Sequence, residues 1–330
     1  MTVTPFEQFL DRHDDAAWAA VVTKLLASIH EVDRTATQIW FRFYPLALWR
    51  ALREAENPSK LAAELLLQGD YYLKDQIDSS HAFLYGHRFW PEVKRAIIER
   101  ASAANASADL AATIRELAQN SAVQAGRDES LLVGITAVGL MTLQQVGLFA
   151  FKAAAGAVVI SERAARKSPE QVLKERARDD SQGLLGFLKT IDKEWTVTFD
   201  ENDPRARYKM KNATDLAYGA AEDRSRDWRA VDPRRIEGPI PVECRSASCG
   251  TCWVGVLGGA EKLSDVARLE GKRVKEFGYV ETDEPKPLIR LACQAQASGA
   301  VSIVIPPWNG VFGKYLRALK TEETQAEAGQ

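Results

Sequence analysis

The stretch C-R-S-A-S-C-G-T-C, residues 244–252, decides how the second half of this chain folds. It brings three cysteines into nine residues, and a single further cysteine follows after a gap of forty residues. These four are all the cysteines of a 330-residue chain, and they are too few for a disulfide scaffold. One site that gathers four thiolates is the natural interpretation, and such a site implies a metal.

The spacing C-x4-C-x2-C with a distant fourth cysteine is the plant-type arrangement of [2Fe-2S] ligands. The residues between the cysteines are small, so backbone N–H groups can approach the sulfurs of an anionic cluster. Zinc is one alternative, but structural zinc usually uses two C-x2-C pairs, and only Cys249 and Cys252 form one. Disulfides fit a cytosolic chain less well, and inert buried thiols do not explain three cysteines in nine residues.

The two halves of the chain differ in their hydrophobic pattern. In the first half apolar residues recur every three or four positions, which predicts helices at 39–53, 58–67, 91–101, 107–118 and 162–178. The second half has short strand-like runs at 196–199, 207–210, 253–257 and 301–305, and a short helix at 214–222. The sequence therefore predicts an α+β chain, with an all-α domain over residues 1–190 and a second domain with a C-terminal tail over residues 191–330.

The cysteine loop, the predicted hairpin before it and the stretch L-A-C-Q-A at 291–295 together resemble the plant and bacterial [2Fe-2S] ferredoxin family. The resemblance covers about residues 195–307 and implies a β-grasp fold, a [2Fe-2S] cluster and the transfer of single electrons. It carries the role of cluster and metal ligand to four positions, Cys244, Cys249, Cys252 and Cys293. Family loops usually have glycine where Ala247 stands, so a positive φ at this alanine would cost about 1 kcal/mol.

Charge and missing motifs narrow the function. Lys and Arg total 43 and Asp and Glu total 45, so the net charge of −2 offers no general attraction to nucleic acid, and we expect no nucleic-acid partner. The chain has no phosphate loop, dinucleotide fingerprint or hydrolase elbow. We therefore expect an electron-transport protein or subunit rather than a stand-alone catalyst. Its helical domain would dock to a redox partner, a reductase or an oxidoreductase complex, while a redox-sensing or structural iron–sulfur subunit is the alternative.

Two stretches bear on location. The first 25 residues carry six charges, unlike a secretory signal, so we expect a cytoplasmic protein. The run 131–151 has no charge across 21 residues and reaches the length of a membrane span. Its glycines and the paired Gln144 and Gln145 favour a buried helix of the first domain. Membrane association, and hence a membrane-peripheral location, is the alternative.

Two other groups of polar residues have both a structural and a functional interpretation. His81 and His87, with Asp75 and Asp78 nearby, could bind a metal, but a separation of six residues does not put two ligands on one helical face, which favours packing. Residues 224–235 carry five arginines and resemble an insertion in the ferredoxin pattern. They would form a basic face near the cysteines unless the acidic residues among them neutralise it.

Overall fold

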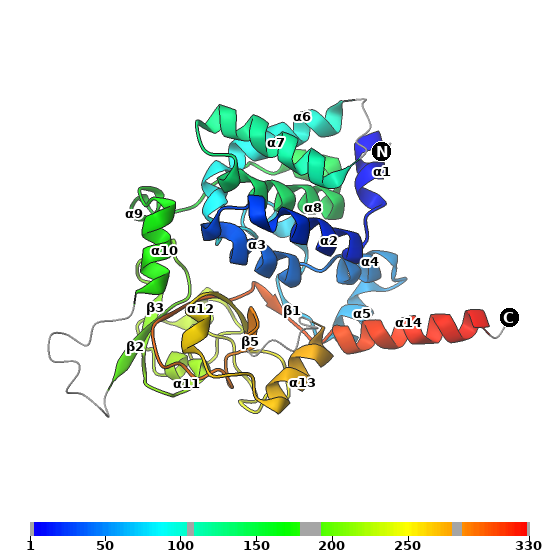
Figure 1. The fold of residues 1–330 in the computed structure, drawn as a ribbon. Coiled ribbons are helices and arrows are strands. Elements are labelled where there is room, and N and C mark those ends of the chain that lie inside the picture. The colour runs from blue at the N-terminus through cyan, green and yellow to red at the C-terminus, as the bar shows by residue number, and fades with distance from the viewer. Residues whose placement is uncertain (1–2, 104–108, 179–192, 279–285, 329–330) are drawn as a thin grey trace. The chain divides into compact units, whose positions relative to one another are not determined.

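The computed structural model describes residues 3–103, 109–178, 193–278 and 286–328. Contacts divide the chain into two compact units, each made of two segments (Figure 1). The first unit is Met1–Arg50 with Tyr72–Leu173, and the second is Ala51–Tyr71 with Lys174–Gln330. The boundary predicted near residue 190 falls in 179–192, outside the described residues.

The first unit is helical, as the spacing of its apolar residues predicts. Its helices are α1 (Pro5–Asp11), α2 (Asp15–Leu25), α3 (Glu31–Phe43), α6 (Trp90–Ser102), α7 (Leu110–Ala125), α8 (Ser130–Ala153) and α9 (Glu162–Ala165), with 3-10 helices at Leu26–Ser28, Leu73–Gln76 and Tyr85–Phe89. The residues of α4 (Leu46–Glu54) and α10 (Pro169–Ala177) are divided between the two units.

Two segments that the sequence predicts as single helices are each divided into two helices. The segment expected to be helical over 39–53 is interrupted between α3 and α4, because Pro45 has no N–H to continue the first helix. The charged segment expected to be one helix over 162–178 is interrupted between α9 and α10, and Pro169 begins the second helix. Proline thus sets both breaks, and the periodicity of the apolar residues does not reveal them.

Helix α8 contains the uncharged run and lies against α1, α3, α6 and α7 within the first unit (Figure 1). Among the described helices it alone is long and apolar enough to cross a membrane, and 89% of its apolar window is buried. Gln144 Oε1 accepts a hydrogen bond from Trp18 Nε1 at 2.6 Å, and Gln145 Nε2 donates to the Tyr44 carbonyl at 3.3 Å. The protein itself therefore supplies the partners that both glutamines need.

The second unit is built on a five-stranded sheet in the order β3-β2-β6-β4-β5. Its strands are β2 (Glu194–Thr198), β3 (Arg207–Lys211), β4 (Trp253–Gly258), β5 (Ile289–Leu291) and β6 (Val301–Val304). The predicted hairpin is confirmed, because β2 and β3 pair antiparallel with Trp195 opposite Met210. Strands β2 and β6 pair in parallel, while β4 pairs antiparallel with both β5 and β6.

Helical elements also belong to the second unit. They are α5 (Pro58–Glu64), α11 (Leu216–Ala221), α12 (Trp228–Val231), a 3-10 helix at Ala260–Lys262, α13 (Arg268–Phe277) and α14 (Gly313–Ala328). The short helix predicted at 214–222 is confirmed as α11. The predicted C-terminal tail is helical as α14, and α13 lies between the third and fourth cysteines, where the sequence predicted no element.

A segment from the first quarter of the chain also belongs to the second unit. Strand β1 (Gln68–Gly69) pairs antiparallel with β7 (Trp308–Asn309). The Leu65 side chain is fully buried, and its carbonyl accepts a hydrogen bond from the Val311 N–H at 2.9 Å. The second unit therefore contains more than the ferredoxin-like segment expected over 195–307. It also includes β1, from far upstream in the sequence, and β7, which directly follows the segment.

Candidate metal centre

The cysteine loop precedes β4, and the fourth cysteine follows β5. Because these strands are antiparallel neighbours with Trp253 opposite Leu291, the residues just before the first and just after the second meet at one end of the sheet. The Ala292 N–H donates to the Cys252 carbonyl at 2.9 Å and fixes this meeting point. Pairing of the two strands thus brings Cys252 and Cys293 together across forty residues of chain.

The loop turns its backbone N–H groups towards sulfur. Cys244 Sγ accepts hydrogen bonds from the N–H groups of Ser246, Ser248 and Cys249 at 3.3–3.4 Å. Such a concave set of N–H groups binds anions and stabilises negative charge on the sulfur. The predicted approach of the backbone to the cysteine sulfurs is therefore present.

Left-handed backbone makes this turn possible. Arg245, Ala247 and Gly250 have φ values of +52°, +59° and +71°. Position 247 thus has the positive φ at which a glycine would be unstrained, and an alanine there costs about 1 kcal/mol. The Ala247 methyl group is nearly fully buried, so the same side chain also contributes to packing.

The four thiols form two pairs. The side chain of Cys244 interacts with that of Cys249, and the side chain of Cys252 interacts with that of Cys293. Among the described residues, no three His, Cys, Asp or Glu side chains gather as they would around a single metal ion. A [2Fe-2S] cluster takes two thiolates at each of two irons, so the donor set and its pairing fit this group better than a single tetrahedral zinc.

Each pair holds one acidic thiol. Burial raises the pKa of Cys244, but hydrogen bonds from Ser248 and Ser246 outweigh it and lower the value to about 6. The hydrogen bond from Cys252 lowers the pKa of Cys293 to about 7 despite burial. The same hydrogen bond, followed by burial, raises the pKa of Cys252 well above its ordinary value. Binding of a cluster must displace the thiol protons of both pairs.

Helix α13 supports the site from two sides, and the sequence did not predict it. Phe277 is buried against the cysteine loop, where a Cβ on Gly250 would lie 2.9 Å from its ring. Glu270, 1% exposed, accepts hydrogen bonds from Arg290 Nε at 2.9 Å and Nη2 at 3.0 Å, and from the Leu291 N–H at 3.0 Å. The helix is thus tied to the strand that leads into Cys293. For the ion pair of Glu270 with Arg290, the one signal in the sequence is an arginine within the apolar run L-I-R-L-A.

Several of the arginines near the loop pair with carboxylates. Arg234 and Arg235 both pair with Asp232, and Arg245 pairs with Glu237. On α13, Arg273 pairs with Glu276 at 2.6 Å, and Lys272 approaches the same carboxylate. These carboxylates therefore offset part of the positive charge of this surface.

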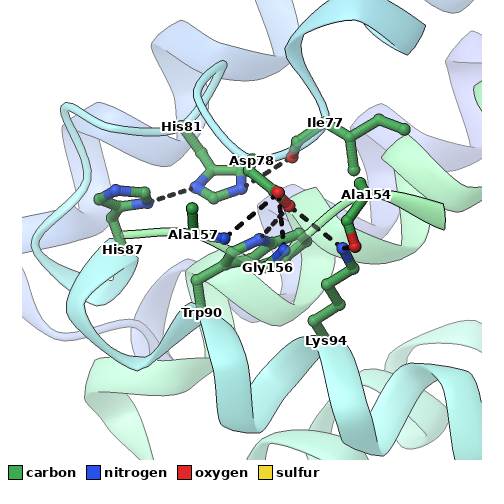
Figure 2. A network of polar contacts seen from close by, with 9 residues as sticks. All are labelled: Ile77, Asp78, His81, His87, Trp90, Lys94, Ala154, Gly156 and Ala157. Carbon is green, nitrogen blue, oxygen red and sulfur yellow. Dashed lines mark hydrogen bonds and ion pairs between the residues drawn. The ribbon is translucent and has the colours of Figure 1, made fainter. Parts of the chain in front are cut away.

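The two histidines lie in the first unit and contact each other directly (Figure 2). Their Nδ1 atoms are 3.0 Å apart, and His81 Nε2 donates to the Ile77 carbonyl at 3.2 Å. A neutral His81 with its proton on Nε2 accepts at Nδ1, so His87 Nδ1 is the donor. Burial lowers the pKa of both rings, and burial with the charge of Arg88 lowers that of His87 to about 4.

The neighbouring carboxylate is also occupied by protein groups. Asp78 accepts hydrogen bonds from Trp90 Nε1 at 2.8 Å, Lys94 Nζ at 3.2 Å and the Gly156 N–H at 2.7 Å (Figure 2). These contacts join α6 to the segment after α8. The described residues here form a buried packing network in which both histidines and Asp78 bond to protein groups, as the packing interpretation expects.

Comparison with known families identifies part of the second unit. Residues 232–298 match the family model of the 2Fe-2S iron-sulfur cluster binding domain. The match contains all four cysteines together with β4, α13 and β5, whereas β2, β3 and β6 lie outside it. The N-terminal region has no family match, and no solved structure matches the chain.

Fold and site together define a protein with a helical N-terminal region and a C-terminal iron–sulfur domain. This domain belongs to the ferredoxin-like [2Fe-2S] family, and it binds a [2Fe-2S] cluster. The family assignment and the cofactor predicted from the sequence are thereby confirmed. Such a domain supports an iron–sulfur electron-carrier role.

Proposed function

We propose that this protein carries single electrons on a plant-type [2Fe-2S] cluster and docks to a redox partner through its helical unit. Cys244 and Cys249 hold one iron, and Cys252 and Cys293 hold the other. The observation that carries this assignment is the pairing of the four thiols inside the matched domain. The bound cluster accepts and releases one electron at a time.

The residues around the thiols have distinct parts in this function. The N–H groups that converge on Cys244 Sγ stabilise added negative charge, which favours electron uptake. Cys244 and Cys249 are half-buried beside the exposed Ser246 and Ser248, whereas Cys252 and Cys293 are buried. Electrons therefore enter and leave on the Cys244 side, and the buried pair anchors the cluster to the sheet.

The same proposal assigns a β-grasp fold to the second unit. In that fold the first strand of a hairpin pairs in parallel with a later strand at the centre of a mixed sheet. Here β2 pairs with β3 in a hairpin and with β6 in parallel, and β4 follows β6 in the strand order. The element order agrees with the ferredoxin resemblance of residues 195–307.

Docking to the partner relies on shape more than on charge. Each half of the chain has a net charge of −1, and Arg234 and Arg245 near the cysteine loop pair with carboxylates. Long-range electrostatic steering is therefore weak. We place the protein in the cytoplasm, and the burial of α8 favours a packed core helix over a membrane-spanning one.

The ligand assignment is tested on the full chain by metal analysis and spectroscopy. We expect two irons and two labile sulfides per chain, and an electron paramagnetic resonance signal after reduction. Cys249→Ser and Cys293→Ser should lose or severely destabilise the cluster, because each removes a thiolate. Ser246→Ala in the same loop is the control and should keep the cluster. One zinc without labile sulfide would refute the assignment.

The carrier role is tested by turnover with the reductase or oxidoreductase that co-purifies with the full chain. We expect rapid reoxidation of the reduced protein, with a rate that falls only modestly as the Debye length shrinks from about 10 Å at 0.1 M salt to about 3 Å at 1 M. A cluster that is reduced but never reoxidised by this protein would favour the redox-sensing or structural alternative. A steep fall with salt would show that charge selects the partner.

A further inference from the structure

The side chain that follows the fourth cysteine turns back onto that cysteine. Gln294 Nε2 lies 2.8 Å from the Cys293 carbonyl oxygen and 3.6 Å from Cys293 Sγ. The backbone is held in a turn, since the N–H groups of Gln294 and Ala295 both donate to the Leu291 carbonyl. Because the backbone is fixed in this turn, Gln294 Nε2 stays close to Cys293 Sγ.

The carbonyl contact settles which end of the amide faces the sulfur. A carbonyl oxygen only accepts hydrogen bonds, so it selects the NH2 group of Gln294 and excludes its oxygen. One N–H of this group meets the carbonyl, and the second is available to Cys293 Sγ. The amide is therefore oriented as a donor to the thiolate.

Burial increases the effect of this contact. Cys293 is 6% exposed and Gln294 is half-buried, so little water competes for the sulfur. A hydrogen bond to a thiolate ligand stabilises the more negative, reduced form of a cluster more than the oxidised form. Unlike the backbone donors to the sulfurs, this donor is a side chain, so a substitution can remove it without altering the backbone.

We propose that Gln294 is a positioning residue that raises the reduction potential of the cluster by donating its side-chain N–H to Cys293 Sγ. The proposal rests on the ligand role given to Cys293 above. It adds a specific determinant of the potential, and hence of the class of donor able to reduce the protein.

The test is the midpoint reduction potential of the full-length protein. It is measured by redox titration, following the electron paramagnetic resonance signal of the reduced cluster. In Gln294→Leu the equilibrium constant for reduction should fall about three- to tenfold, and a tenfold fall is about 59 mV for one electron. Gln294→Glu should lower it further, because it replaces the donor by a negative charge. Gln296→Leu makes the same change at an exposed position two residues further on and should leave the potential unchanged.

Iron and sulfide analysis of each variant separates the possible failures. Equal potentials in wild type, Gln294→Leu and Gln296→Leu, all with full clusters, would overturn the role of Gln294 and leave the proposed function intact. A wild-type protein without two irons and two sulfides would overturn the proposed function itself. If Gln294→Leu loses the cluster, Gln294→Glu and Gln294→Met decide the question, and a potential equal to wild type in either would refute the proposal.

Discussion

The buried ion pair between α13 and β5 gives the sharpest prediction for stability. Glu270 and Arg290 are each about 1% exposed, and Arg290 makes two hydrogen bonds to the Glu270 carboxylate and one to the Ser264 carbonyl. In Glu270→Gln the guanidinium stays buried without a counter-charge. Breaking a buried pair in this way costs about 3–5 kcal/mol. The second unit has a size at which 1 kcal/mol shifts Tm by about 2–4 °C, so we expect a fall of about 10 °C.

Thermal melting at a fixed scan rate, followed by visible absorbance of the cluster and by circular dichroism, measures this change. The control is Glu162→Gln, which breaks an Arg–Glu pair whose side chains, Arg166 and Glu162, are 79% and 89% exposed. It should shift Tm by about 1 °C or less, because exposed pairs contribute little.

A double variant separates the charge from the packing. Glu270→Leu combined with Arg290→Met removes both charges and keeps apolar volume, and it should recover most of the lost stability. The reasoning is refuted if Glu270→Gln melts with the wild type. It is also refuted if the double variant is no more stable than the single one, since an uncompensated charge would then not be the cause.

Two further predictions concern single residues. Gly250→Ala should destabilise the second unit by about 2–3 kcal/mol, because residue 250 is left-handed and a Cβ there would meet Phe277. Gly126 is also left-handed but lies in open space, so Gly126→Ala should destabilise its own unit by only about 1 kcal/mol. Equal losses of stability in melting experiments would contradict the clash with Phe277. The pKa of His87 is about 6.5 in the unfolded chain and about 4 in the fold, so the folded state favours the neutral ring. The free energy of unfolding is therefore at its full value above pH 6.5 and falls by about 3 kcal/mol as the pH drops towards 4. Denaturant unfolding should show a steeper loss of stability with falling pH in the wild type than in His87→Gln, where the buried His81 still contributes, and identical pH profiles would argue against it.

The sequence by itself determined the cofactor and most local structure. Four cysteines in the C-x4-C-x2-C pattern are a local constraint, because the loop between Cys244 and Cys252 must wrap its backbone around sulfur whatever surrounds it. The helical periodicity of the first half and the β2–β3 hairpin depend on neighbours in sequence, so they were also predictable. Comparing Ala247 with the family pattern raised the question of a positive φ there, and the structure supplied the answer.

Long-range contacts decided the rest. No local pattern shows that residues 51–71 leave the helical half of the chain and pair β1 with β7, because a two-residue strand is defined only by its partner. Nor does the sequence show that Glu270 meets Arg290 or that Phe277 packs on Gly250, since each pair is separated by twenty residues or more. The amide of Gln294 is polar in any chain, and only the turn after β5 aims it at Cys293 Sγ. The identity of the cluster is thus local chemistry, whereas the shell that tunes and protects it is a product of tertiary packing.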